Sequence, residues 1–195
     1  MGNSGVTWRG DSIDDIEILL DLPADLRDVL TDTNGFILQS GALHVRGASL
    51  APEWHSLRTA WRGPQSFFVL YPNVKQSDIP FAQDQVGDQL LLRGSVVVRL
   101  FAETGDIEFI SETLHEFFRR TETGIEEFLN MGLSRGMEPG QLLHAYPPFC
   151  TAESSAGTSL KPLPASEVIF LHAELAKAIR NVPDGDQIRF KPTDS

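Results

Sequence analysis

Hydrophobic residues form four short runs between positions 79 and 110, and turn-forming residues separate them. The runs are Ile79–Ala82, Gln89–Leu92, Val96–Leu100 and Ile107–Ile110. The third run could also be a piece of buried helix, because its apolar residues are nearly continuous. Its length, its β-branched residues and the glycines that flank it favour a strand. The pattern therefore predicts a small antiparallel sheet that organises the chain.

Apolar residues at helical spacings of three and four predict helices before and after this sheet. Asp11 and Ser111 are placed to cap the first and fourth of them, and Gly124 is expected to bend the fourth. The predicted helices are Asp11–Leu20, Ala24–Thr31, Pro52–Trp61, a segment that begins at Ser111, and Ser166–Asn181. Helices grouped around a mixed, mostly antiparallel sheet indicate an α+β fold.

Shorter segments complete the predicted organisation. Residues 1–10 are expected to be frayed apart from Trp8. The predicted extended segments are Phe36–Leu38, Ala42–Val45, Gln65–Leu70 and Gln187–Lys191, and Thr151–Ser159 reads as a surface loop. A chain of 195 residues is most compatible with a single domain. We expect a core at residues 8–140, and residues 141–195 as an appendage of loop, helix and short strand packed on that core.

Charge and composition narrow the function classes. The formal net charge is −11, so the chain repels phosphate backbones and nucleic-acid binding is not expected. Acidity would steer a basic protein partner toward the chain, although plain solubility explains it equally simply. The single cysteine permits no internal disulfide. The start of the sequence lacks a signal peptide pattern, and no apolar run reaches membrane-spanning length, so we expect a cytoplasmic protein without membrane insertion.

No motif for catalysis, metal binding or cofactor binding stands out. Cys150 has no activating neighbour in the sequence, which favours an ordinary thiol. His115-Glu116 begins like a zinc motif, but Arg119 occupies the position of the second ligand. Phosphate-binding glycine motifs are absent from the sequence. We therefore expect no enzyme activity, no metal and no cofactor. The alternative is an unrecognised hydrolase or metalloenzyme with a polar pocket near Cys150.

Acidic residues cluster around two Gly-Asp dipeptides in the predicted sheet. Glycine followed by aspartate is common in turns, so turn formation is one interpretation. The other is that the carboxylates form an acidic rim at one edge of the sheet, which would bind a basic partner. The candidate partner-binding residues are Asp84, Asp88, Glu103, Asp106 and Glu108.

The order of these signals resembles the SUKH superfamily, which includes yeast cell-wall synthesis regulators, Syd and bacterial toxin-immunity proteins. The resemblance covers roughly residues 8–130. It rests on Leu22-Pro23, Asn34-Gly35, Gly87-Asp88 and Ser111 with Phe117 and Phe118. The chain departs from the pattern at Phe36, where the family often has a second glycine. It also departs at Thr113-Leu114, where the family usually has an aromatic residue after the serine.

The resemblance implies a single α+β domain that binds a protein and performs no catalysis. Many such modules are immunity proteins that bind and block a cognate bacterial toxin, often a nuclease. A nuclease is basic because it holds phosphates, so an acidic inhibitor fits it. The alternative that the resemblance offers is a regulatory or scaffold protein with a house-keeping partner. No pattern in the sequence predicts an oligomeric state.

Overall fold

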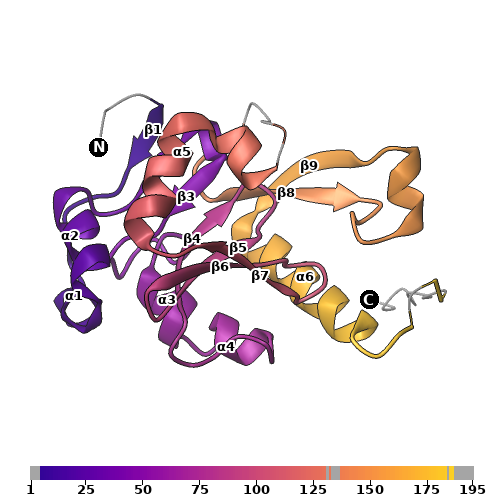
Figure 1. Ribbon diagram of the computed structural model, residues 1–195, viewed down its shortest axis with the longest axis horizontal. Coiled ribbons are helices and arrows are strands. Elements are labelled where there is room, and N and C mark those ends of the chain that lie inside the picture. The colour runs from indigo at the N-terminus through magenta and orange to yellow at the C-terminus, as the bar shows by residue number, and fades with distance from the viewer. Residues whose placement is uncertain (1–4, 131, 133–136, 184, 187–195) are drawn as a thin grey trace.

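The computed structural model describes residues 5–130, 132, 137–183 and 185–186. A seven-stranded sheet crosses the molecule, and its strands follow one another in chain order (Figure 1). Every neighbouring pair within it is antiparallel. The strands are β1 Val6–Arg9, β2 Phe36–Leu38, β3 Leu43–Val45, β4 Ile79–Asp84, β5 Gln89–Arg93, β6 Val96–Leu100 and β7 Ile107–Ser111. The predicted α+β class and the four central strands are therefore confirmed.

Helices cover both faces of this sheet. They are α1 Ile16–Asp21, α2 Ala24–Asp32, α3 Leu57–Arg62, α4 Phe67–Leu70, α5 Leu114–Leu129 and α6 Ala165–Ile179, with short 3-10 turns η1 Gln39–Gly41 and η2 Ala152–Ala156. One core cluster joins α1, α2 and α5 to the sheet, and a second joins α4 and α6 to its other face. Leu90 and Leu92 enter the first cluster, whereas Leu91 enters the second. The continuous apolar run of β5 therefore reflects burial on both faces.

The C-terminal part of the chain adds a second, two-stranded sheet. Strand β8, Gln141–Tyr146, pairs antiparallel with β9, Ser159–Pro164. This hairpin projects away from the main sheet, with η2 near its tip, and α6 returns along the core (Figure 1). We call residues 141–179 the C-terminal arm. Ala173 and Ala176 of α6 belong to the second core cluster, while Leu142 and Val168 join the hairpin to α6.

Several predicted boundaries were wrong, because a different side chain caps the helix. Asp15 caps α1: its Oδ1 accepts from the N–H of Ile18 at 3.1 Å, so the helix does not begin at Asp11. Thr113 caps α5, where its hydroxyl accepts from the N–H of Glu116. Ser111 instead ends β7. The helical backbone is interrupted at Gly124, as predicted.

Other differences concern short segments with weak patterns. Residues 67–70, predicted as extended, form α4, because the Ser66 carbonyl accepts from the N–H groups of Val69 and Leu70. Residues 6–9, predicted as frayed, form β1 through pairing with β2. The predicted strand at Gln187–Lys191 lies outside the described residues.

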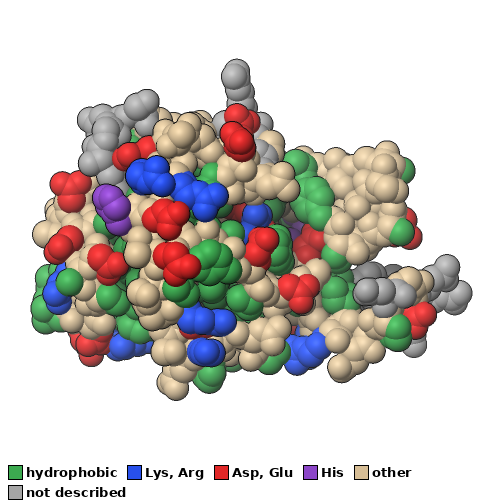
Figure 2. All heavy atoms as spheres, in the orientation of Figure 1, with side chains coloured by type: hydrophobic (Ala, Val, Ile, Leu, Met, Phe, Trp, Pro, Cys, Tyr) green, Lys and Arg blue, Asp and Glu red, His purple; other side chains and the backbone are tan. Residues whose placement is uncertain are grey.

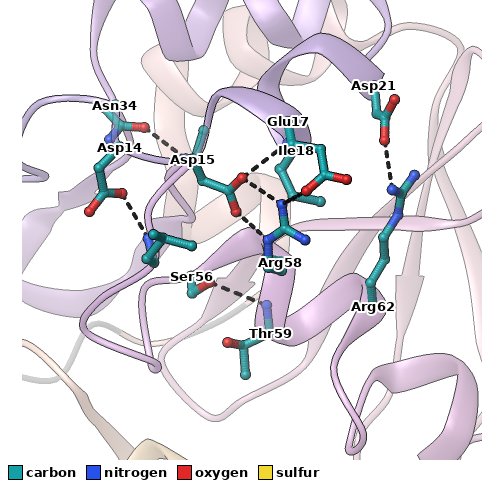
Figure 3. A network of polar contacts seen from close by, with 12 residues as sticks. Asp14, Asp15, Glu17, Ile18, Asp21, Asn34, Ser56, Arg58, Thr59 and Arg62 are labelled. Atoms are coloured by element: carbon teal, nitrogen blue, oxygen red, sulfur yellow. Dashed lines mark hydrogen bonds and ion pairs between the residues drawn. The ribbon is translucent and has the colours of Figure 1, made fainter.

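A polar network ties α1 to α3 (Figure 3). Arg58 donates to both carboxylate oxygens of buried Asp15, at 2.6 and 2.7 Å, and to Glu17 at 2.6 Å. The Arg58 hydrogen bond holds the pKa of Asp15 below its ordinary value. Arg62 pairs with Asp21 at 2.6 Å in a more exposed position. One arginine therefore neutralises the cap of α1 and fixes that helix on α3.

Candidate protein-binding site

The turn between β4 and β5 is built around two buried carboxylates. The Oδ1 atom of Asp84 accepts from the N–H groups of Val86 and Asp88, both at 3.0 Å. Gly87 has a φ of +92°, which favours glycine. The Oδ1 atom of Asp88 accepts from the N–H of Ala102 at 2.8 Å. These two carboxylates therefore hold the turn and attach it to the chain that follows β6.

Arg99, near the end of β6, neutralises this pair. Its Nη2 atom lies 2.8 Å from Asp84 Oδ2 and 2.7 Å from Asp88 Oδ2. Its Nη1 atom donates to the carbonyl of Leu129 at the end of α5. Burial raises the pKa of Asp84, the neighbouring charge of Asp88 adds to that rise, and Arg99 opposes it. Because buried charges require partners, this triad is part of the core and not of the surface.

Glu103 connects the core to the C-terminal arm. Its two carboxylate oxygens accept from the N–H groups of Phe149 and Cys150, at 3.1 and 2.8 Å. Only 8% of Glu103 is exposed. No basic side chain in the described part of the chain forms an ion pair with it. Glu103 is therefore hydrogen-bonded, but its negative charge has no cationic partner there.

A cavity of about 310 Å³ lies between this junction and the arm, and we call it the arm cavity. Its apolar wall includes Phe101, Leu143 and Phe149, and its acidic groups include Glu103 and Asp106. Figure 2 shows hydrophobic side chains with acidic ones beside them where the projecting hairpin joins the rest of the molecule. The arm cavity thus combines apolar walls with negative charge.

His172 of α6 also lines the arm cavity. It is 4% exposed, and its Nδ1 atom has no hydrogen-bond partner. Burial, assisted by the neighbouring His144, lowers the pKa of His172 to about 4. The imidazole is therefore neutral near pH 7 and offers an unused polar atom. A buried polar atom without a partner is uncommon in folded proteins.

Cys150 lines the arm cavity but is not activated. Burial and the charge of Glu103 raise the pKa of the Cys150 thiol to about 11. Because the thiolate is the reactive form, this sulfur is a weak nucleophile near neutral pH. The geometry therefore favours the interpretation of Cys150 as an ordinary thiol.

The structure separates the five carboxylates that the sequence analysis grouped as an acidic rim at one edge of the sheet. Asp88, Glu103 and Asp106 come together at the arm cavity, whereas Asp84 and Glu108 do not line it. Asp84, Asp88 and Glu103 are buried, so these three carboxylates do not belong to a solvent-facing rim, and partner binding by the five residues stays a prediction. Turn formation and the long-range partner Arg99 explain the burial of the first two. Asp106 and Glu108 are exposed.

A second buried polar system crosses the opposite side of the sheet from α5. Its hydrogen bonds run from Arg46 to Gln83 (2.6 Å), from Gln83 to His44 (3.3 Å), between His44 and His55 (2.9 Å), and from His55 to the Asn34 carbonyl (3.0 Å). A carbonyl accepts only, so His55 Nε2 carries a hydrogen and its Nδ1 accepts from His44 Nε2. The sequence did not predict this hydrogen-bonded system, because its members are far apart in the sequence.

His44 and His55, the two histidines of this hydrogen-bonded system, serve packing and not chemistry. Burial lowers the pKa of His55 to about 4 and that of His44 well below its ordinary value. Both rings also pack against Trp54, at centroid distances of 5.1 and 5.5 Å. With all their ring nitrogens in hydrogen bonds, neither histidine has an atom left for a ligand.

Within the described residues, no three His, Cys, Asp or Glu side chains are grouped as a metal ion would need. None of the helices described has the length and apolar character that crossing a bilayer requires. Comparisons with models of known families, with curated proteins and with solved structures found no match for this chain.

Proposed function

We propose that this protein is a non-catalytic binding module that neutralises a bacterial toxin by holding it in a complex. The sequence resemblance to the SUKH superfamily supports the toxin as partner, and the surface of the C-terminal arm supports protein binding. The acidic balance supports a basic toxin domain such as a nuclease, because opposite charges speed the encounter and add specificity.

The observation that carries this proposal is the exposed apolar surface of the arm. Among the described residues, five large hydrophobic side chains on or beside its strands and helix are exposed by 37% to 74%: Tyr146, Phe149, Leu160, Phe170 and Leu171. These are five of the eleven large hydrophobic side chains that are exposed among the described residues, and such groups commonly mark an interaction surface. Folding alone does not require them, since the arm already packs through Leu142 and Val168.

Part of this surface is continuous with the arm cavity. Leu160 of β9 lies directly opposite Ala145 of β8. Directly opposed residues in antiparallel strands point to the same face, so Leu160 extends the face that carries Ala145. Ala145 lines the arm cavity together with Phe149. A partner that covers this face would therefore bury apolar area and meet the carboxylates at the same time.

Co-purification tests the proposal. The tagged protein is co-expressed with the product of the neighbouring gene, where that gene encodes a large secreted protein, and complex formation and protection from toxicity are measured. Phe149→Ser with Leu160→Ser is expected to abolish both. Ile16→Ser with Leu20→Ser on α1, where both side chains are exposed, is the matched control and is expected to leave both intact.

Two results would reject the proposal. The first is the absence of any complex and of any protection with the wild-type protein. The second is equal binding by the arm variant and the wild type. Recovery of a translocon or signalling component in place of a toxin would favour a regulatory role for the same module.

A further inference from the structure

We propose that the arm cavity receives a lysine or arginine side chain of the protein partner, an inference that rests on the function proposed above. The cavity lies between the core and the arm, so a side chain entering it would contact both parts. Three features point to a cationic side chain: an uncompensated carboxylate, an unused hydrogen-bonding atom, and apolar walls in the same cavity.

The uncompensated carboxylate is Glu103. Buried charges in proteins are normally paired with an opposite charge, because removal from water is costly. Only 8% of Glu103 is exposed, and its hydrogen-bond partners are the backbone N–H groups of Phe149 and Cys150 and the Cys150 thiol, none of which carries a positive charge. Arg99, a buried cation on β6, is already shared by Asp84 and Asp88. A cation from outside the chain would complete the pairing.

The unused atom is Nδ1 of His172. The ring is neutral near pH 7, so one of its nitrogens carries no hydrogen and can accept a hydrogen bond. Lysine and arginine side chains are donors only. In the tautomer with hydrogen on Nε2, Nδ1 is the acceptor that such a donor would use. An anionic ligand would meet the carboxylates of Asp88, Glu103 and Asp106 here, and no lysine or arginine is among the described residues that line the cavity.

The apolar walls suit the rest of a long basic side chain. Lysine and arginine carry a charged group on an aliphatic stem, and the stem packs well against apolar surface. Phe101, Leu143 and Phe149 supply that surface. Asp106, which is exposed at the same cavity, adds negative charge where a cation would approach from solvent. The cavity therefore offers apolar surface for the aliphatic stem and carboxylates for the charged group.

A capped peptide, acetyl-Ala-Arg-Ala-amide, tests the inference on the full chain. Its binding is followed by NMR through the amide signals of Phe149 and Cys150, whose hydrogens bond Glu103. We expect saturable shifts of both signals with the arginine peptide and with its lysine counterpart. The citrulline peptide, which has nearly the same shape without the charge, is expected to bind at least about tenfold more weakly, as the loss of a charge-assisted hydrogen bond predicts.

Three variants decide which carboxylates act. Glu103→Gln and Asp106→Asn are each expected to weaken the arginine peptide several-fold, and the exposed Asp106 provides a variant that leaves the fold intact. Glu108→Gln, an exposed residue that does not line the cavity, is the matched control and is expected to bind as the wild type does.

Equal binding of the arginine and citrulline peptides, or unchanged binding by Asp106→Asn and Glu103→Gln, would overturn the inference. Such a result leaves the proposed function standing if the wild-type protein still captures its toxin. If the wild-type protein captures no toxin but still binds the arginine peptide, the proposed function alone is rejected. The two failures are therefore distinguishable.

Discussion

Replacement of His172 by leucine should stabilise the protein, and more strongly in acid than at neutral pH. His172 is 4% exposed, and its Nδ1 atom lacks a partner. Leucine has a similar bulk and no polar atom, so the substitution removes an unsatisfied group from the interior. It also removes an imidazole that stays neutral in the folded protein below pH 6.5, where the same imidazole is protonated in the unfolded chain.

The size of the acid effect follows from the pKa of His172. Burial lowers this pKa from 6.5 to about 4 in the folded protein. A group whose pKa is depressed on folding binds more protons when unfolded, so stability falls as the pH drops from 6.5 toward 4. Between about pH 7.5 and about pH 5, this linkage costs the wild type about 2 kcal/mol of unfolding free energy. His172→Leu does not incur that loss.

Urea unfolding of both proteins at the two pH values measures the effect as a difference. The difference between the two proteins is needed because the raised pKa of Asp84 makes both of them more stable as the pH falls. This contribution is the same in the wild type and the variant, so it cancels in the difference. Leu171→Ala on the same helix contains no titrating change and should shift stability equally at both pH values. If the advantage of His172→Leu is the same at both pH values, His172 is not held neutral by burial.

Three further outcomes follow from the buried polar contacts. Asp15→Ala removes the cap of α1 and the partner of Arg58, and should lower the unfolding free energy measured in urea by about 2 to 4 kcal/mol. Asp21→Ala, in the more exposed ion pair, should lower it by less than about 1 kcal/mol. Equal losses for the two variants would contradict this prediction. Arg99→Met leaves two buried carboxylates without a cation and should cost about 3 to 5 kcal/mol, with recovery in acid, when they become protonated; a loss that stays unchanged in acid would point to packing alone. Nitrogen NMR of the neutral rings of His44 and His55 should show hydrogen on Nε2 of both, and an Nδ1-H form of either ring would refute the assigned hydrogen-bond chain.

The central sheet could be predicted because its signals are local. Each of the four strands from β4 to β7 is short and rich in apolar residues, and Gly-Asp or Arg-Gly turns divide them. Their observed ends lie within two residues of the predicted ones. Strands β8 and β9 were missed because their order comes from pairing with each other. The sequence of β9, SLKPLP, contains two prolines and no alternating pattern.

The candidate site was only partly predictable, because its geometry depends on contacts distant in sequence. The sequence identified Glu103 and Asp106 as acidic candidates near a turn. It did not show that Arg99 folds back onto Asp84 and Asp88, or that residues 149–150 close over Glu103. A basic residue inside a run of valines was the available signal for a buried ion pair, since an arginine in a buried strand needs a carboxylate.

The aspartates of the two Gly-Asp turns therefore have different roles, although the turns look alike in the sequence. Asp88 faces inward, where Arg99 and the N–H of Ala102 use its carboxylate, so a lysine there would place two cations together in the core. Asp106 is exposed at the arm cavity and does not have this structural role in the core. Lysine substitutions at positions 84 and 88 would thus report on folding, whereas a change at Asp106 reports on electrostatic attraction between intact proteins. Negative charge thus builds the first turn, and we propose that at Asp106 it attracts a partner.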